Sequence, residues 1–219
     1  MPELSREGDV FVIDIGSDEN RFHPDWIAGF NDALDQVEKS EGSKAVVTKA
    51  TGKFWSNGLD LDWLTANGDQ AGAYYASVHG LFARVLALPV PTVAAVQGHC
   101  FAAGAMIALA HDFRVMRADR GFFCLPEVDL GLPFTPGMNA LIMARLPQPT
   151  AHAAMTTGRR YGGTDALAAR IVDAVASEND VLKVALEMAA PLAGKSGAAL
   201  GAIKERMYED ALRALRDAG

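Results

Sequence analysis

The sequence predicts an α/β fold, and three observations support this prediction. Runs rich in β-branched residues alternate along the chain with stretches in which apolar side chains recur at helical spacing. Two strand–helix–strand units follow one another, and a loop of turn residues comes after each. Half of the 219 residues are hydrophobic and only 21% are charged, so the chain can bury a substantial core.

The first unit covers residues 10–49. Residues 10–15 are typical of a strand, and residues 16–20 of a turn. A helix is expected from Pro24, where helices favour proline, to Gly42, with one apolar face made of Trp26, Ile27, Phe30, Leu34 and Val37. Residues 44–49 form the second strand. This order implies a parallel pair of strands with a right-handed crossover.

The second unit consists of a helix over residues 71–88, which Pro89 and Pro91 end, and a strand over residues 92–97. Further along we expect a strand at 112–117, short helices at 138–145, 149–157 and 164–169, a strand or loop at 171–175, and amphipathic helices at 179–192 and 197–215. No linker separates these elements. We therefore expect one domain, with a core over residues 1–175 and a helical C-terminal section over residues 176–219.

Composition excludes several functions. The net charge of −7 argues against a general nucleic-acid binder, which needs a basic face. No apolar run approaches the ~20 residues of a membrane span, and neither chain end resembles a signal peptide or a peroxisomal address. Cys100 and Cys124 form no metal-type cluster, the histidines show no ligand spacing, and so few cysteines suit a reducing compartment. We expect a cytoplasmic protein with no metal, nucleic-acid or membrane partner.

Two loops have the composition of ligand sites. After the strand at 92–97, small residues at 102–105 open an apolar helical stretch, and the first N–H groups of a helix have no internal partner. A carbonyl oxygen that gains negative charge could be held there, although close packing of a core helix also selects alanine and glycine. In the loop at 50–62, Gly58 could bring the N–H of Leu59 close to a ligand. Asp60 and Asp62 are expected to cap or begin the following helix.

Three motifs, in order and at fitting spacing, identify a family that the chain resembles. They are Trp55-Ser-Asn-Gly-Leu-Asp-Leu61, the run from Gln97-Gly98 through Ala102-Ala103-Gly104 to Asp112, and Pro126-Glu-Val-Asp-Leu-Gly-Leu-Pro133. Each is similar to a motif of the enoyl-CoA hydratase/isomerase (crotonase) superfamily, with the last proline one position early. The resemblance covers about residues 10–175.

The resemblance implies a fold, a substrate and a set of site residues. The fold would be a crotonase-like spiral of β-β-α units, with C-terminal helices for oligomerisation and site closure, in a homotrimer or a dimer of trimers. The substrate would be an acyl-CoA thioester, and because coenzyme A is part of it, no cofactor is expected. The backbone N–H groups of Leu59 and Ala103 would form an oxyanion hole, and Glu127 would be catalytic. The residues expected to bind substrate are Lys53, Ser56, Asn57, Gly58, Asp60, Gly104 and Phe134.

Met106 is the informative departure from the family pattern, because hydratases of the family carry a second glutamate there. A thioether is at best a weak acceptor, so Glu127 is left as the one carboxylate. One base suffices to move a double bond, by taking a proton from C2 and returning it at C4. The chain therefore looks most like a monofunctional Δ3,Δ2-enoyl-CoA isomerase of fatty-acid degradation. Apolar neighbours should raise the pKa of Glu127, namely Phe122, Phe123, Leu125, Leu130 and Leu132.

Other interpretations remain open. A hydratase would need a second carboxylate, for instance from Asp60, Asp62 or Asp129, and thioester hydrolysis or decarboxylation would use the same oxyanion hole. A non-catalytic acyl-CoA-binding subunit is the alternative from another class. A Clp-like serine peptidase is disfavoured because residues 98–112 contain no serine, and a dinucleotide-binding domain because no Gly-x-Gly-x-x-Gly follows the first strand. Among the basic residues, Lys53 is the first candidate to bind a CoA phosphate. Arg21, Lys204 and Arg206 are weaker candidates for the same role.

Overall fold

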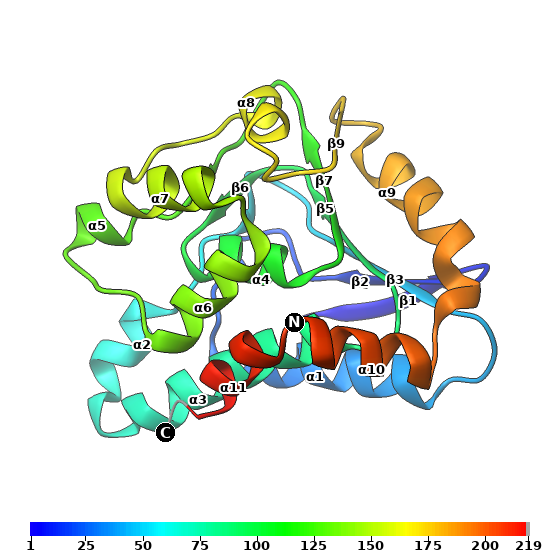
Figure 1. Cartoon of the computed structure of the whole chain (residues 1–219), viewed down its shortest axis with the longest axis horizontal. Helices are drawn as coiled ribbons and strands as arrows, with labels where there is room; N and C mark the ends of the chain where they lie inside the picture. The colour runs from blue at the N-terminus through cyan, green and yellow to red at the C-terminus, as the bar shows by residue number, and fades with distance from the viewer. Residues whose placement is uncertain (218–219) are drawn as a thin grey trace.

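A computed structural model describes residues 1–217 and contains a large sheet of six strands (Figure 1). Their order across the sheet is β1 (Glu3–Glu7), β2 (Val10–Asp14), β3 (Ala45–Lys49), β5 (Thr92–Val96), β7 (Phe113–Arg117) and β9 (Ala174–Ala176). The edge strand β1 is antiparallel to β2, and every other pair is parallel. The parallel pairing expected for the first two predicted strands is confirmed, with Val10 opposite Ala45.

A second, smaller sheet explains the spiral that the resemblance implies. It consists of β4 (Phe54–Ser56), β6 (His99–Phe101) and β8 (Phe123–Cys124), all parallel. Each short strand follows a strand of the large sheet and precedes a helix, which gives the repeated β-β-α unit. Sequence periodicity missed these strands because two or three residues cannot show an alternation. It also missed β1, whose residues are mostly exposed.

The helices agree largely with the predicted ranges. They are α1 (Pro24–Lys39), α2 (Leu61–Ala66), α3 (Ala71–Ala87), α4 (Ala103–Ala110), α5 (Glu127–Leu130), α6 (Pro136–Arg145), α7 (Gln148–Thr157), α8 (Gly163–Ala168), α9 (Val181–Ala189), α10 (Ala198–Met207) and α11 (Glu209–Arg216), with 3-10 turns at Gly68–Gln70 and Ala190–Lys195. The single helix predicted over 197–215 is wrong, because the chain breaks at Tyr208 into α10 and α11. The helix predicted over 179–192 ends early in a 3-10 turn.

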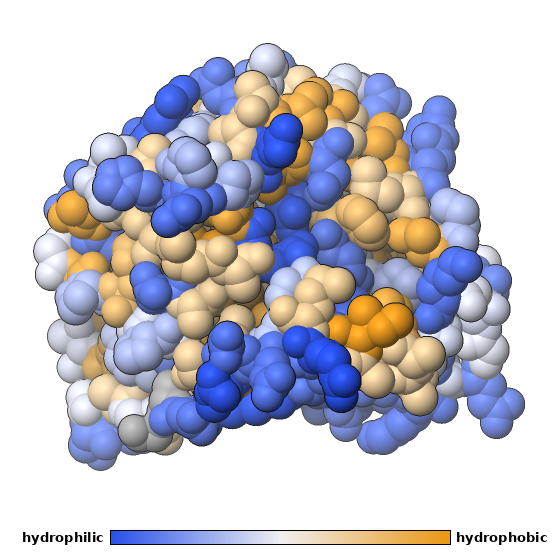
Figure 2. Space-filling model, in the orientation of Figure 1, coloured by the Kyte–Doolittle hydropathy of each residue, from blue (hydrophilic) through white to orange (hydrophobic). Residues whose placement is uncertain are grey.

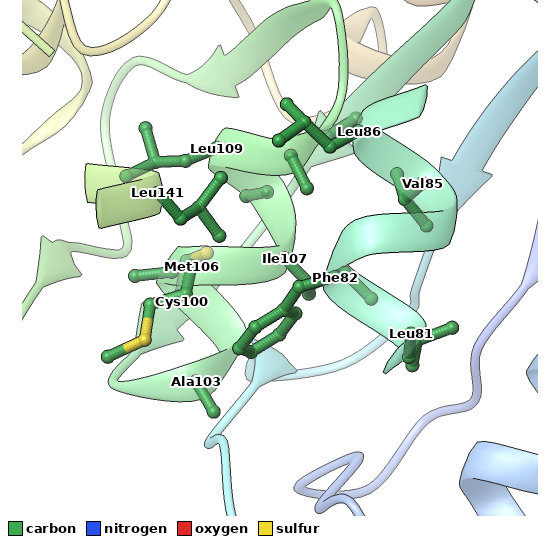
Figure 3. Packing of buried hydrophobic residues seen from close by; sticks show 14 of the residues in the cluster. Leu81, Phe82, Val85, Leu86, Cys100, Ala103, Met106, Ile107, Leu109 and Leu141 are labelled. Atoms are coloured by element: carbon green, nitrogen blue, oxygen red, sulfur yellow. The ribbon is translucent and has the colours of Figure 1, made fainter. Parts of the chain in front are cut away.

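Helices cover both faces of the large sheet, which explains its continuous apolar strands. On one face lies α9, whose buried side chains Val181, Ala185 and Ala189 pack against β2, β3, β5 and β7 (Figure 1). On the other face lie α1, α3 and α4. All eight residues of α4 are buried, and Ile107 lies near Phe82 of α3 (Figure 3). The small-residue turn therefore begins a central core helix.

The C-terminal helices lie along the same side as α1 and α3 (Figure 1). Helix α11 packs against α6 and α3, and it buries Leu212 and Leu215. Helix α10 is fixed by Lys204, whose ammonium is 2.6 Å from the Asp112 carboxylate and also donates to the carbonyls of Leu88 and Val90. Within residues 1–217, no helix is both long and apolar enough to cross a membrane.

Candidate active site

A largely apolar cavity of about 660 Å³ lies among α2, α3, α4, α5 and α6. Its wall is made of Arg21, Asn57, Leu59, Leu61, Asp62, Tyr75, Phe101, Ala102, Ala103, Met106, Pro126, Glu127, Leu130, Leu132, Pro133, Thr135 and Met138. The cavity thus brings together Leu59, Ala103 and Glu127, one from each of the three motifs. An apolar cavity with a few convergent polar groups is typical of a small-molecule site.

Glu127 is the buried carboxylate of this cavity. It begins the one-turn helix α5, which Pro126 precedes and which ends at Gly131 in a left-handed conformation. The side chain is only 7% exposed, and its Oε2 has no hydrogen-bond partner within residues 1–217. This burial raises the pKa of Glu127 from the ordinary 4.5 to about 7. The carboxyl can therefore gain and lose a proton near neutral pH.

The apolar surroundings predicted for Glu127 are only partly those of the structure. Leu130 and Leu132 line the cavity and are about half exposed. Figure 2 shows orange side chains over α5 at the left edge of the molecule. Phe123 and Leu125 are buried in the core, and Phe122 is 37% exposed away from the cavity.

The loop around Leu59 leaves one backbone donor unused. Asn57, Gly58, Asp60 and Leu61 each donate their N–H to an acceptor within the chain. The N–H of Leu59 donates to no group in residues 1–217. Because Leu59 lines the cavity, this N–H is available to a ligand there.

A second free donor lies beside it at the start of α4. The N–H of Ala103, the first residue of the helix, also has no acceptor in the described part of the chain. Ala102 precedes it with φ +51° and ψ −126°, a conformation that costs a non-glycine residue about 1–3 kcal/mol. Gly58, with φ +83°, approaches so closely that an added Cβ would lie 2.9 Å from the Ala103 nitrogen. The two donor loops are therefore in contact.

Comparison with known proteins now identifies the family. The enoyl-CoA hydratase/isomerase family matches residues 6–218 of the chain. The chain belongs to the enoyl-CoA hydratase/isomerase family. This confirms the resemblance of the three motifs and the crotonase-like fold.

Relatives within the family are similar over almost their whole length. The chain is 36% identical to the peroxisomal enoyl-CoA delta isomerase 2 of Arabidopsis thaliana, covering 96% of this chain and 93% of that protein. It is also 36% identical to Arabidopsis enoyl-CoA delta isomerase 3, covering 97% and 94%. Among solved structures, a probable enoyl-CoA hydratase of Mycobacterium tuberculosis has a TM-score of 0.91 at 29% identity, covering 98% of this chain and 91% of the other.

The cavity also contains residues that only the fold reveals. Tyr75 on α3, and Thr135 and Met138 at the start of α6, line the cavity. The sequence Thr135-Pro136 is typical of a helix start, so it could have predicted Thr135 as a helix N-cap but not its place in the cavity. Arg21 lines the mouth, with a nitrogen 2.6 Å from the Asp62 carboxylate.

Some predicted substrate-binding residues lie behind the cavity wall. Ser56 is fully buried, accepts the N–H of Gly58, and donates to the carbonyl of Asn20. Gly104 packs on it so tightly that an added Cβ would lie 2.5 Å from the Ser56 carbonyl oxygen. These contacts hold the two donor loops in place.

Other predicted residues lie elsewhere. Lys53 lines a separate cavity of about 260 Å³, and its ammonium lies 5.1 Å from the Phe54 ring centre. Phe134 packs against the core, whereas its neighbours in the sequence, Pro133 and Thr135, line the cavity. Asp60 caps α2 by accepting the N–H of Trp63, as expected, and lines a neighbouring cavity. Lys204 is buried in its ion pair with Asp112, so its suggested contact with CoA phosphate is wrong.

Proposed function

We propose that the protein is a Δ3,Δ2-enoyl-CoA isomerase that uses Glu127 as its single base. The observation that carries this proposal is a buried carboxyl with a pKa of about 7 in the same cavity as two unused backbone donors. The names of the Arabidopsis relatives support the reaction type.

The backbone donors would stabilise the developing charge. The N–H groups of Leu59 and Ala103 would donate to the thioester oxygen, which gains negative charge as the α-carbon loses a proton. One such donor is worth ~10²–10³ in rate. Since neither group has to break an internal hydrogen bond first, the hole is ready before substrate enters.

Glu127 would then move one proton. As a carboxylate it takes a proton from C2 of a 3-enoyl-CoA, and the electron pair spreads into a dienolate held by the two N–H groups. The same carboxyl returns the proton at C4, which leaves the double bond between C2 and C3. Atoms and charges balance without an oxidant or a metal, so coenzyme A is needed only as part of the substrate.

The positions of the other carboxylates support isomerisation over hydration. Asp60 is engaged as the cap of α2, and Asp62 is 88% exposed in its ion pair with Arg21. Asp129 lies outside the cavity wall, with its carboxylate close to Gly158. Met106 is 1% exposed and lines the cavity, at the position where the motif resemblance implies a second glutamate in hydratases.

A turnover assay with two substrates tests the proposal. Purified protein should convert a 3-enoyl-CoA and hydrate a 2-enoyl-CoA negligibly, and Glu127→Gln should bind both but turn over neither. Fast hydration would reveal a second acid group and contradict the one-base mechanism. Binding without turnover of the 3-enoyl-CoA would favour the non-catalytic subunit.

We also propose that the chain self-associates, as the homotrimer or dimer of trimers expected above. Ile203 and Met207 on α10 are 56% and 63% exposed, which supports a contact there. Light scattering at two protein concentrations tests this, and a monomer at both would contradict it.

A further inference from the structure

Thr135 is one of the polar residues that line the largely apolar cavity. It is the N-cap of α6, and its Oγ1 accepts the N–H of Met138 at 3.2 Å. The same oxygen lies 2.8 Å from Nε2 of His79, which reaches it from α3. His79 is 1% exposed, so this contact is inside the protein.

The position of the imidazole proton follows from the other ring nitrogen. Nδ1 of His79 is buried and has no partner within residues 1–217. Burial lowers the pKa of His79, so the ring is neutral and carries one N–H. Placing that proton on Nδ1 would bury an unpaired N–H, which is rarer in proteins than an under-used acceptor. The proton therefore belongs on Nε2, which donates to Thr135.

Thr135 is then left with a free donor. A hydroxyl has two lone pairs and one hydrogen. Both lone pairs are used, one by Met138 N–H and the other by His79 Nε2–H. No other acceptor for the hydroxyl hydrogen lies within hydrogen-bond distance in the described part of the chain, and Thr135 lines the cavity. A plain hydrocarbon chain would offer this donor nothing.

We propose that Thr135 is a specificity-determining residue that donates a hydrogen bond to an oxygen atom on the acyl chain of the substrate. The preferred acyl-CoA carries a hydroxyl, carbonyl or ether oxygen beyond the reacting carbons. The inference rests on the proposed function to the extent that the ligand is an acyl-CoA. Since the thioester oxygen is held by Leu59 and Ala103, the oxygen that Thr135 meets belongs to the outer part of the chain.

Equilibrium binding of unreactive thioesters tests this without turnover. We would measure, by calorimetry, the Kd of saturated acyl-CoAs of one length in which each outer methylene in turn is replaced by a carbonyl or an ether oxygen. At one position the oxygen analogue should bind the native protein about tenfold more tightly than the hydrocarbon. Thr135→Val should remove this preference, and Thr135→Ser should keep it.

A matched control is Thr157→Val, because Thr157 is an exposed threonine at the end of α7. It should leave the preference unchanged. The proposal is overturned if no oxygen position improves binding to the native protein, or if the preference survives in Thr135→Val. Should Thr135→Val fail to fold for want of its cap, the native series decides, because the proposal requires one oxygen position that improves binding to the native protein. If instead the proposed isomerase function is wrong, the protein would still show the oxygen preference in binding the unreactive thioesters but would not convert a 3-enoyl-CoA.

Discussion

Replacing Glu127 by glutamine should stabilise the fold while abolishing turnover, and the stabilisation should grow with pH. The folded protein holds a proton on Glu127 up to a pKa of about 7, whereas the unfolded chain releases it near 4.5. Between these values the folded state binds more protons, so this residue makes stability fall as pH rises. Ionised Glu127 in its buried position costs free energy of folding. Glutamine has the same shape but cannot ionise, so Glu127→Gln removes this cost.

The magnitude follows from the size of the pKa shift. A rise from 4.5 to about 7 corresponds to about 3 kcal/mol at ~1.36 kcal/mol per unit. This penalty is fully present above pH ~7 and is mostly absent at about pH 5. The free-energy difference between Glu127→Gln and the native protein should therefore increase by about 2–3 kcal/mol between these conditions.

Urea unfolding of both proteins at the two pH values and one fixed protein concentration measures this. Taking the difference between variant and native protein cancels the titration of every other group. A difference that stays constant within ~0.5 kcal/mol would refute the claim that Glu127 sits in a desolvated site. The same result would remove the physical reason for calling it a base tuned to neutral pH.

Three further results follow from the same geometry. The kcat/KM for a 3-enoyl-CoA should rise with pH through an apparent pKa near 7, because only the carboxylate form of Glu127 accepts the proton; a flat profile would contradict this role. Gly58→Ala should lower kcat by ~10²-fold or more, because its Cβ meets Ala103 N at 2.9 Å and its φ is +83°. Gly80 is the control, because it is exposed within α3 and has open space around it, so Gly80→Ala should stabilise the folded protein by ~0.5–1 kcal/mol and leave kcat unchanged. An equal loss of kcat in both variants would show that the effect of Gly58→Ala is not specific to the donor loops. Lys204→Met should cost about 3–5 kcal/mol in urea unfolding, since it leaves the Asp112 carboxylate without its ammonium partner; a loss under ~1 kcal/mol would show that the pair does not fix α10.

Sequence reasoning succeeded where the periodicity was long or a motif was complete. The strand at 10–15, the helix from Pro24 and the α3 helix have enough residues to reveal their period, and they appear close to the predicted bounds. The three motifs placed Leu59, Ala103 and Glu127 around one cavity, although their roles stay predictions. Each motif lies at the end of a strand, and parallel strands bring such ends together.

The short strands and the polar contacts of the fold depend on residues that are far apart in the sequence, so no local pattern predicts them. Strands of two or three residues owe their existence to pairing across the small sheet, not to their own composition. Lys204 resembles a solvated charge in the sequence, and only the fold brings it to Asp112, 92 residues away. Thr135 and His79 lie 56 residues apart in the sequence and meet because α3 and α6 both pack against α4 and α11. Charged and polar side chains with such distant partners are those that sequence periodicity describes least well.

The central claim, one buried base that carries a proton from C2 to C4, is tested most directly by isotope transfer. A 3-enoyl-CoA deuterated at C2 is converted in ordinary water, and the product is examined by mass spectrometry and NMR. Because Glu127 is only 7% exposed, the deuteron it removes should exchange slowly with solvent, and a substantial share should reappear at C4 of the same molecule. Product that carries no deuterium at C4, even in a single turnover, would show that a second group or water delivers the proton, and would contradict the one-base account.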